Sequence, residues 1–125
     1  MHPKTHNPAF LKLVDQARSR VREVTVEDYR SEAKTSTPPV LVDVREDHEW
    51  EQGHAADAVH LGKGIIERDA ESKFPDKSTP LVLYCGGGYR SALAADALQQ
   101  MGYTHVASLA GGWRAIVDSG MATSR

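Results

Sequence analysis

The sequence predicts an α/β fold in which helices cover both faces of a largely parallel sheet. Apolar runs of strand length occur at residues 40–44, 80–84 and 105–109, and continuous apolar runs are typical of strands buried on both faces. Segments with the apolar spacing of helices separate these runs, and such alternation favours a parallel sheet. At 125 residues, 40% of them hydrophobic, the chain is long enough for one domain with its own core.

The first third of the chain contains two expected helices, a turn and a strand. Apolar residues recur at helical spacing over residues 8–21, which predicts an amphipathic helix. Thr25 and Asp28 form the capping-box pattern that begins a short helix over residues 26–34. The turn "TSTPP" then leads into "VLVDV", the strand at 40–44.

The later elements follow by the same criteria. Gly53 and Gly102 each stand where a helix is expected to end. The predicted order is a short polar helix, "REDHEWEQG", a weaker strand at 58–61, one or two short helical turns within 62–74, the strongest strand at 80–84, a helix over 91–101, a strand at 105–109 and a last helix, "GGWRAIVDSG".

The composition gives no indication of a nucleic-acid or membrane partner. The formal net charge is −2, and no stretch approaches 18 uninterrupted apolar residues. The N-terminal "MHPKTHNPAF" lacks the apolar centre of a secretory signal, so a cytoplasmic location is expected. "HEWEQ" (48–52) begins like the zinc-protease motif His-Glu-x-x-His, but Gln52 stands where the second ligand is needed. Neither a metal site nor a cofactor is therefore expected.

Cys85, the single cysteine, directly follows the strongest predicted strand, and a single cysteine excludes an internal disulfide. In open α/β sheets, ligands bind beyond the carboxyl ends of the strands. Asp43 and Arg45 lie at the end of another predicted strand. Tyr89, inside the loop after the cysteine, either lines the mouth of a site or faces solvent. The sequence therefore places the candidate site around Cys85.

The loop after Cys85 has the features that stabilise an anionic sulfur. Gly86, Gly87 and Gly88 allow the backbone to curl so that successive N–H groups point at one spot. The helix that begins near Arg90 adds unpaired amides and its dipole, and the guanidinium adds a permanent cation. The alternative is a small buried cysteine in a tight strand-to-helix turn, which leaves three consecutive glycines without a packing role.

Three separated motifs resemble those of single-domain rhodaneses, a group of sulfurtransferases. "CGGGYRS" (85–91) is similar to the family's Cys-x-x-Gly-x-Arg-Ser active loop, and "LVDVRE" (41–46) to its Leu-x-Asp-x-Arg signature. "AGGWRAI" (110–116) resembles the family's Gly-Gly-Trp helix start. "GHAADA" (53–58) departs from the family's Gly-His-Ile-Pro-Gly-Ala, which affects the turn into a strand and not the chemistry.

The resemblance implies a rhodanese-like fold with a mostly parallel five-stranded sheet. The rhodanese domain would span residues 22–120, between an N-terminal helical extension (1–21) and a C-terminal tail (121–125). It also implies that Cys85 is the nucleophile. Its thiolate takes the outer sulfur of thiosulfate or of a persulfide and keeps it until cyanide or a thiol removes it. Donor and acceptor are small molecules, and a protein in either role is a further option.

The resemblance assigns roles to residues around the cysteine. Asp43 and Arg45 would brace the loop from the neighbouring strand. Arg68, in "GKGIIERD", is a candidate for a second cation at the pocket rim, and the alternative is an exposed, solvated side chain. The residues expected to bind substrate within the loop are Gly86, Gly87, Gly88, Tyr89, Arg90 and Ser91.

Two other functions stay open at this point. Phosphatases and arsenate reductases of this fold have a Cys-x5-Arg loop, whereas four residues separate Cys85 from Arg90, which favours sulfur over a tetrahedral oxyanion. A module that carries or senses sulfur without turning it over would also keep the cysteine and its loop. Because Gly86 and Gly87 place no cation in the early loop, we expect modest activity with thiosulfate and a different physiological donor.

Overall fold

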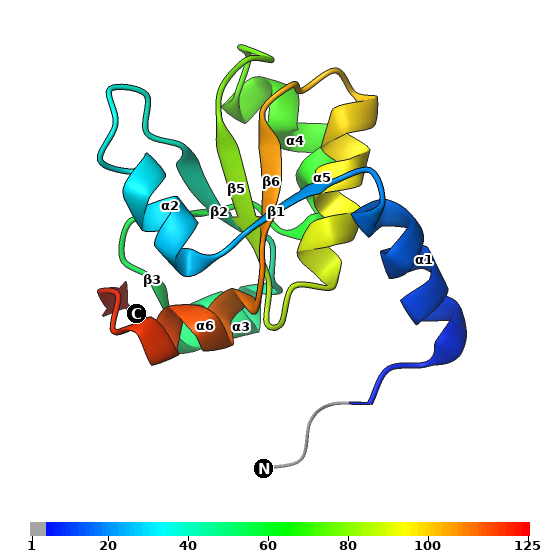
Figure 1. The fold of residues 1–125 in the computed structure, drawn as a ribbon, viewed down its shortest axis with the longest axis horizontal. Coiled ribbons are helices and arrows are strands. Elements are labelled where there is room, and N and C mark those ends of the chain that lie inside the picture. Colours follow the sequence, from blue (N-terminus) through cyan, green and yellow to red (C-terminus); the bar gives the residue numbers. More distant parts are fainter. Residues whose placement is uncertain (1–4) are drawn as a thin grey trace.

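The computed structural model describes residues 5–125 and confirms the predicted fold class (Figure 1). Five strands form one sheet in the order β1-β6-β5-β2-β4, and each neighbouring pair is parallel. The bounds of these strands are β1 (Arg22–Val24), β2 (Val40–Asp43), β4 (Val59–His60), β5 (Leu81–Tyr84) and β6 (Val106–Leu109). β5 is the central strand, so its carboxyl end lies at the middle of one sheet edge, where ligand sites form in such folds.

Helices lie on both sides of the sheet (Figure 1). Within residues 5–125 they are α1 (Pro8–Arg18), α2 (Val26–Glu32), α3 (Asp47–Gln52), α4 (Lys63–Lys73), α5 (Arg90–Gln100) and α6 (Gly112–Ser119). α4 and α5 cover one face, where Ile66 packs in the same buried cluster as Leu83. α2 and α6 cover the other face, where Ile116 packs in the same cluster as Tyr84. Successive side chains of β5 therefore pack against the helices on opposite faces of the sheet, as expected for a strand buried on both faces.

α1 lies outside these two layers and packs on α5. Val14 and Ala17 of α1 form a buried cluster with Ala92 of α5. After the helix, the Arg20 guanidinium donates to both carboxylate oxygens of Asp96, at 3.0 and 2.8 Å. These contacts fix α1 against α5. Among the described residues, no helix combines the length and the apolar character needed to cross a bilayer.

Three strands of the structure, β1, β3 (His54–Ala55) and β7 (Thr123–Ser124), were not expected from local patterns. Arg22–Val24 form β1 at the edge of the main sheet, but three residues are too few to show an apolar alternation. β3 pairs with β7 in a small antiparallel sheet. This pair fixes the "GHAADA" segment, where the sequence departs from the rhodanese pattern, against a distant part of the chain.

α4 is longer than the one or two helical turns that the sequence predicts. It is one continuous helix of 11 residues, Lys63–Lys73. Only Ile66 and Ala70, one turn apart, are buried on it. Two buried side chains hold this helix to the sheet, and it has no broad apolar face. The helical periodicity of its apolar residues is therefore weak in the sequence.

Candidate active site

The loop between β5 and α5 places Cys85 at the carboxyl end of the central strand. Gly88 has φ +98°, a conformation that favours glycine, and its N–H donates to Cys85 Sγ at 3.1 Å. Ser91 Oγ lies 3.6 Å from the same sulfur and is hydrogen-bonded to Ser108 Oγ at 2.8 Å. A main-chain amide and a buried hydroxyl therefore both face the sulfur.

The pKa of the Cys85 thiol lies below its usual value. Burial alone raises this pKa because it disfavours the charged form. Hydrogen bonds from the Ser91 hydroxyl and from the amides of Ser91, Gly88 and Gly87 outweigh the burial and lower the pKa. The site thus favours the thiolate, which is the nucleophilic form of cysteine.

α1, which precedes the loop in the sequence, and α6, which follows it, both donate hydrogen bonds to carbonyl groups of the loop. The Trp113 N–H of α6 donates to the Cys85 carbonyl at 2.7 Å, and Arg18 Nη2 of α1 donates to the Gly88 carbonyl at 3.2 Å. Gly112 has φ +51° and lies so close to the Cys85 carbonyl that a Cβ at this position would overlap it. The start of α6 can therefore approach the loop only with glycine at position 112.

Asp43 and Arg45 form a buried ion pair at the end of β2. Arg45 Nη2 lies 2.8 Å from Asp43 Oδ2, with the two side chains 4% and 0% exposed. Arg45 also donates to the Gly53 carbonyl at 2.6 Å, and its guanidinium lies over the Trp113 ring, 4.7 Å from the ring centroid. The pair reaches the loop indirectly, because Trp113 is the residue whose N–H binds the Cys85 carbonyl.

Glu49 of α3 is a site residue that sequence reasoning missed. Arg90 Nη1 and Nη2 donate to its two carboxylate oxygens at 2.7 and 3.0 Å, and the Glu46 N–H donates to Oε1 at 3.0 Å. The hydrogen bonds from Arg90 outweigh burial and lower the pKa of Glu49 to about 2. The two residues are 41 positions apart and no local pattern connects them. The carboxylate offsets much of the positive charge that Arg90 would present to an anion.

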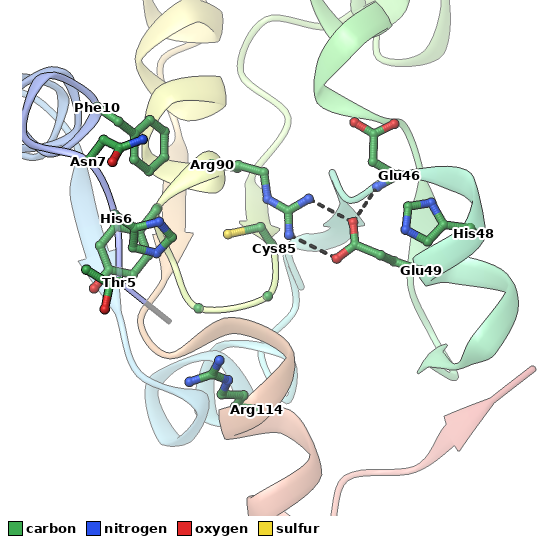
Figure 2. A pocket seen from close by; sticks show the side chains of 13 residues that line it. Thr5, His6, Asn7, Phe10, Glu46, His48, Glu49, Cys85, Arg90 and Arg114 are labelled. Carbon is green, nitrogen blue, oxygen red and sulfur yellow. Dashed lines mark hydrogen bonds and ion pairs between the residues drawn. The ribbon is translucent and has the colours of Figure 1, made fainter. Parts of the chain in front are cut away.

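A cavity of about 750 Å³ opens over the loop, and Cys85 is one of its lining residues. Figure 2 shows the sulfur between the N-terminal segment on one side and α3 on the other. The lining comes from four parts of the chain: the segment into α1 (Thr5, His6, Asn7, Phe10), the start of α3 (Glu46, His48, Glu49), the loop and the start of α5 (Cys85, Gly86, Gly87, Tyr89, Arg90), and α6 (Arg114). Cys85 itself is 1% exposed and lies at a cavity large enough for a small molecule.

Most of the loop residues expected to bind substrate line this cavity. Gly86, Gly87, Tyr89 and Arg90 do so, which places Tyr89 at the cavity rather than in a turn that faces only solvent. Ser91 and Gly88 lie beneath the loop surface and contact the sulfur instead.

Arg68 lies away from the cavity. Its guanidinium pairs with the neighbouring Asp69 at 2.7 and 2.9 Å, and its side chain is 73% exposed. The expected position at the pocket rim is therefore wrong. α4 buries Ile66 and Ala70 against the core, which directs Arg68 toward solvent.

The sequence model of the rhodanese-like domain matches residues 25–119. The chain belongs to the rhodanese-like family. Among curated relatives, the thiosulfate sulfurtransferase PspE of Escherichia coli is 33% identical over 70 residues, covering 56% of this chain and 67% of PspE. The thiosulfate sulfurtransferase GlpE of Coxiella burnetii is 35% identical over 79 residues, covering 61% of this chain and 72% of GlpE. At the level of the family, this rhodanese-like domain is thus a sulfurtransferase homologue.

A solved structure matches nearly the whole of this rhodanese-like domain, including the region before residue 25. It is a Rhodopseudomonas palustris protein of unknown function, named as a possible tyrosine phosphatase, with a TM-score of 0.83 and 30% identity. The match covers 99% of this chain and 100% of that one. The family model, by contrast, does not include α1.

Proposed function

We propose that this rhodanese-like domain is a sulfurtransferase that carries a sulfane sulfur on Cys85. The Cys85 thiolate attacks the terminal sulfur of the donor, and a new S–S bond forms while the donor's bond to that sulfur breaks. With thiosulfate as donor, sulfite leaves with the bonding electron pair. Cyanide or an external thiolate then attacks the outer sulfur and releases the Cys85 thiolate. Because the chain has one cysteine, no internal thiol can perform this second step.

The environment of Cys85 Sγ is the observation that carries this proposal. The Gly88 N–H is 3.1 Å from the sulfur, the Ser91 hydroxyl is 3.6 Å away, and the cysteine lines an open cavity. The same donors would stabilise the thiolate before transfer and the persulfide anion after it. Arg90, oriented by Glu49, would position the donor.

Intact-mass measurement tests the transfer. Incubation with a sulfane-sulfur donor should add the mass of one sulfur atom, and cyanide should remove it. The Cys85→Ser variant, nearly isosteric and expected to keep its fold, should gain nothing. A sulfur adduct that no acceptor removes would indicate a carrier instead. Hydrolysis of an aryl phosphate without any sulfur adduct would indicate the phosphatase alternative.

Thiosulfate is expected to be a modest donor. It carries two negative charges, Gly86 and Gly87 provide no cation beside Cys85, and Arg90 is paired with Glu49. In steady-state assays with cyanide, the KM for thiosulfate should exceed that for a singly charged organic persulfide. An equal or lower KM for thiosulfate would contradict this account of the charge in the site.

A further inference from the structure

One wall of the cavity comes from outside the region that the family model matches. Thr5, His6, Asn7 and Phe10 line the cavity, whereas the match to the family begins at residue 25. In Figure 2 these side chains stand opposite α3, with the Cys85 sulfur between the two groups. The N-terminal segment therefore forms part of the active-site cavity rather than only packing on the outside of the domain.

His6 and Phe10 of this segment lie beside Tyr89 of the loop, and we call these three rings the aromatic wall. The ring of His6 lies 4.3 Å from that of Tyr89 and 5.2 Å from that of Phe10, measured between centroids, and Phe10 and Tyr89 are 6.3 Å apart. These separations are those at which aromatic rings attract one another, and the same ring surfaces can pack against a flat apolar ligand. Tyr89 belongs to the loop that contains Cys85, so the aromatic wall continues directly to the reactive residue.

The helix that contains Phe10 is fixed against the loop and α5. Arg18 of α1 lies over the Tyr89 ring, 4.8 Å from its centroid, and binds the Gly88 carbonyl. Arg20 and Asp96 join the end of the α1 segment to α5 through two hydrogen bonds. A preformed wall binds a ligand without the cost of ordering a loose segment.

The charges that line the cavity balance one another. Glu46 and Glu49 contribute two carboxylates, and Arg90 and Arg114 contribute two guanidinium groups. A cavity of about 750 Å³ is also large for an inorganic anion, since pockets of roughly 300–1,000 Å³ bury drug-sized ligands. Neither the charge nor the size of the site matches thiosulfate as the preferred donor.

From the aromatic wall and the balanced charge, we infer that the site selects a singly charged organic sulfur donor with a flat apolar group. That group packs against His6, Phe10 and Tyr89 while the terminal sulfur reaches Cys85. This inference rests on the proposed transfer of sulfur to Cys85. With a thiosulfonate donor, Cys85 Sγ bonds to the terminal sulfur, the bond between that sulfur and the sulfonyl sulfur breaks, and a sulfinate leaves with the electron pair.

Two thiosulfonates test this inference because they share their charge and reacting group. Benzenethiosulfonate carries a ring, and methanethiosulfonate carries only a methyl group. The ratio of their kcat/KM values should favour the ring by about tenfold in the wild-type protein, the factor expected for one well-packed aromatic contact. Phe10→Ala and His6→Ala should each lower this ratio several-fold. Comparing ratios between variants cancels the intrinsic reactivity of the two donors.

Two further variants serve as controls. Phe10→Tyr keeps a ring at the wall and should keep the preference. Leu13→Ala removes an apolar side chain that is 56% exposed on the same helix and is not part of the cavity lining, so it should leave the ratio unchanged. His6 precedes α1, so its variant remains informative if Phe10→Ala unfolds.

The outcomes separate this inference from the proposed function. Equal use of both donors, with a ratio that is the same in Phe10→Ala, His6→Ala and wild type, would overturn the selection of an apolar donor while the sulfur transfer stands. Failure of both donors and of thiosulfate to load sulfur on Cys85 would overturn the transfer itself, and the inference with it.

Discussion

Ser91 is fully buried and contacts the Cys85 sulfur from beneath the loop. A hydroxyl in this position can donate to the thiolate while it accepts from Ser108. Its hydrogen bond is the strongest of the influences that counteract burial of the thiol. The sulfur is thus activated by the Ser91 hydroxyl and several amides, with the Arg90 cation beside it, rather than by a neighbouring base.

Replacing Ser91 with alanine should raise the pKa of Cys85, because the strongest hydrogen bond that opposes burial of the thiol is then lost. The pH dependence of alkylation by iodoacetamide measures this, since the thiolate is the reacting species. The half-maximal rate should move to higher pH. Ser119→Ala is the matched control, because this hydroxyl bonds to the Ile116 carbonyl at the far end of α6. An unchanged midpoint for Ser91→Ala would contradict the role given to the hydroxyl.

Glu49→Gln tests the ion pair with Arg90. The folded protein lowers the pKa of Glu49 from its ordinary value of 4.5 to about 2. A lowered carboxyl pKa stabilises the fold above pH 4.5, and this stability is lost as the pH falls toward 2. At about 1.4 kcal/mol per tenfold change in proton affinity, the contribution has an upper limit of about 3.5 kcal/mol, and solvent screening of the partly exposed pair reduces it.

Chemical denaturation at several pH values checks this expectation. The difference in unfolding free energy between wild type and Glu49→Gln should be largest above pH 5 and should shrink toward pH 2. Glu51→Gln, an exposed position on the same helix, should change stability by less than about 0.5 kcal/mol. A difference for Glu49→Gln that does not depend on pH would show that the ion pair is not its source.

At the scale of elements, the start of α6 fixes the loop through the contact between Gly112 and the Cys85 carbonyl. Gly112→Ala should lower the unfolding free energy by more than the roughly 1–2 kcal/mol that a left-handed conformation costs alanine, because the new Cβ also overlaps the loop. Gly120→Ala is the control: Gly120 ends the same helix with φ +79° and open space around its Cβ direction. Denaturant unfolding of both variants measures the difference, and equal losses would mean that the loop moves aside without cost.

The elements that the sequence predicts well are those whose pattern is local. The strands at 40–44 and 80–84 and the helix after the loop follow from apolar runs and periodicity, and the structure contains them nearly at those bounds. β1 and the β3–β7 pair could not be predicted in this way. Two or three residues are too few to show a repeating apolar pattern. β1 forms because β6 supplies its hydrogen-bond partners, and β3 and β7 form because they pair with each other.

At the scale of the molecule, the buried pair of Asp43 and Arg45 joins β2 to the Gly53 turn and to α6. Asp43→Ala should cost about 3–5 kcal/mol of unfolding free energy, because it leaves a buried guanidinium without its counter-ion. Asp69→Ala is the matched control, since it breaks an exposed pair with Arg68, and exposed pairs contribute little to stability. Thermal and urea unfolding compare the two. A similar small loss in both would mean that Arg45 finds other partners or water.

Some residues of the candidate site can be predicted from a short motif, whereas others reach it only through the packing of distant segments. Cys85, its glycines and Arg90 form one short motif, so the sequence alone locates the proposed nucleophile and its loop. Glu49 and the wall formed by residues 5–10 come from elsewhere in the chain, and only the packing of α1 and α3 around the loop brings them to the cavity. Arg68 shows the reverse error, because a cation in a helical segment faces the site only if the buried face of the helix directs it there, and Ile66 and Ala70 direct it away.

The hydrogen bond from Trp113 to the Cys85 carbonyl sets an order of events during biosynthesis. A ribosome releases Cys85 and its glycines before it releases residue 113. Until α6 emerges, the nascent polypeptide has the thiol but lacks the amide that anchors the start of its loop. If Cys85 carries sulfur as proposed, loading should follow the emergence of α6, and a translation product that stops before Trp113 should gain less sulfur than the full chain in the presence of donor.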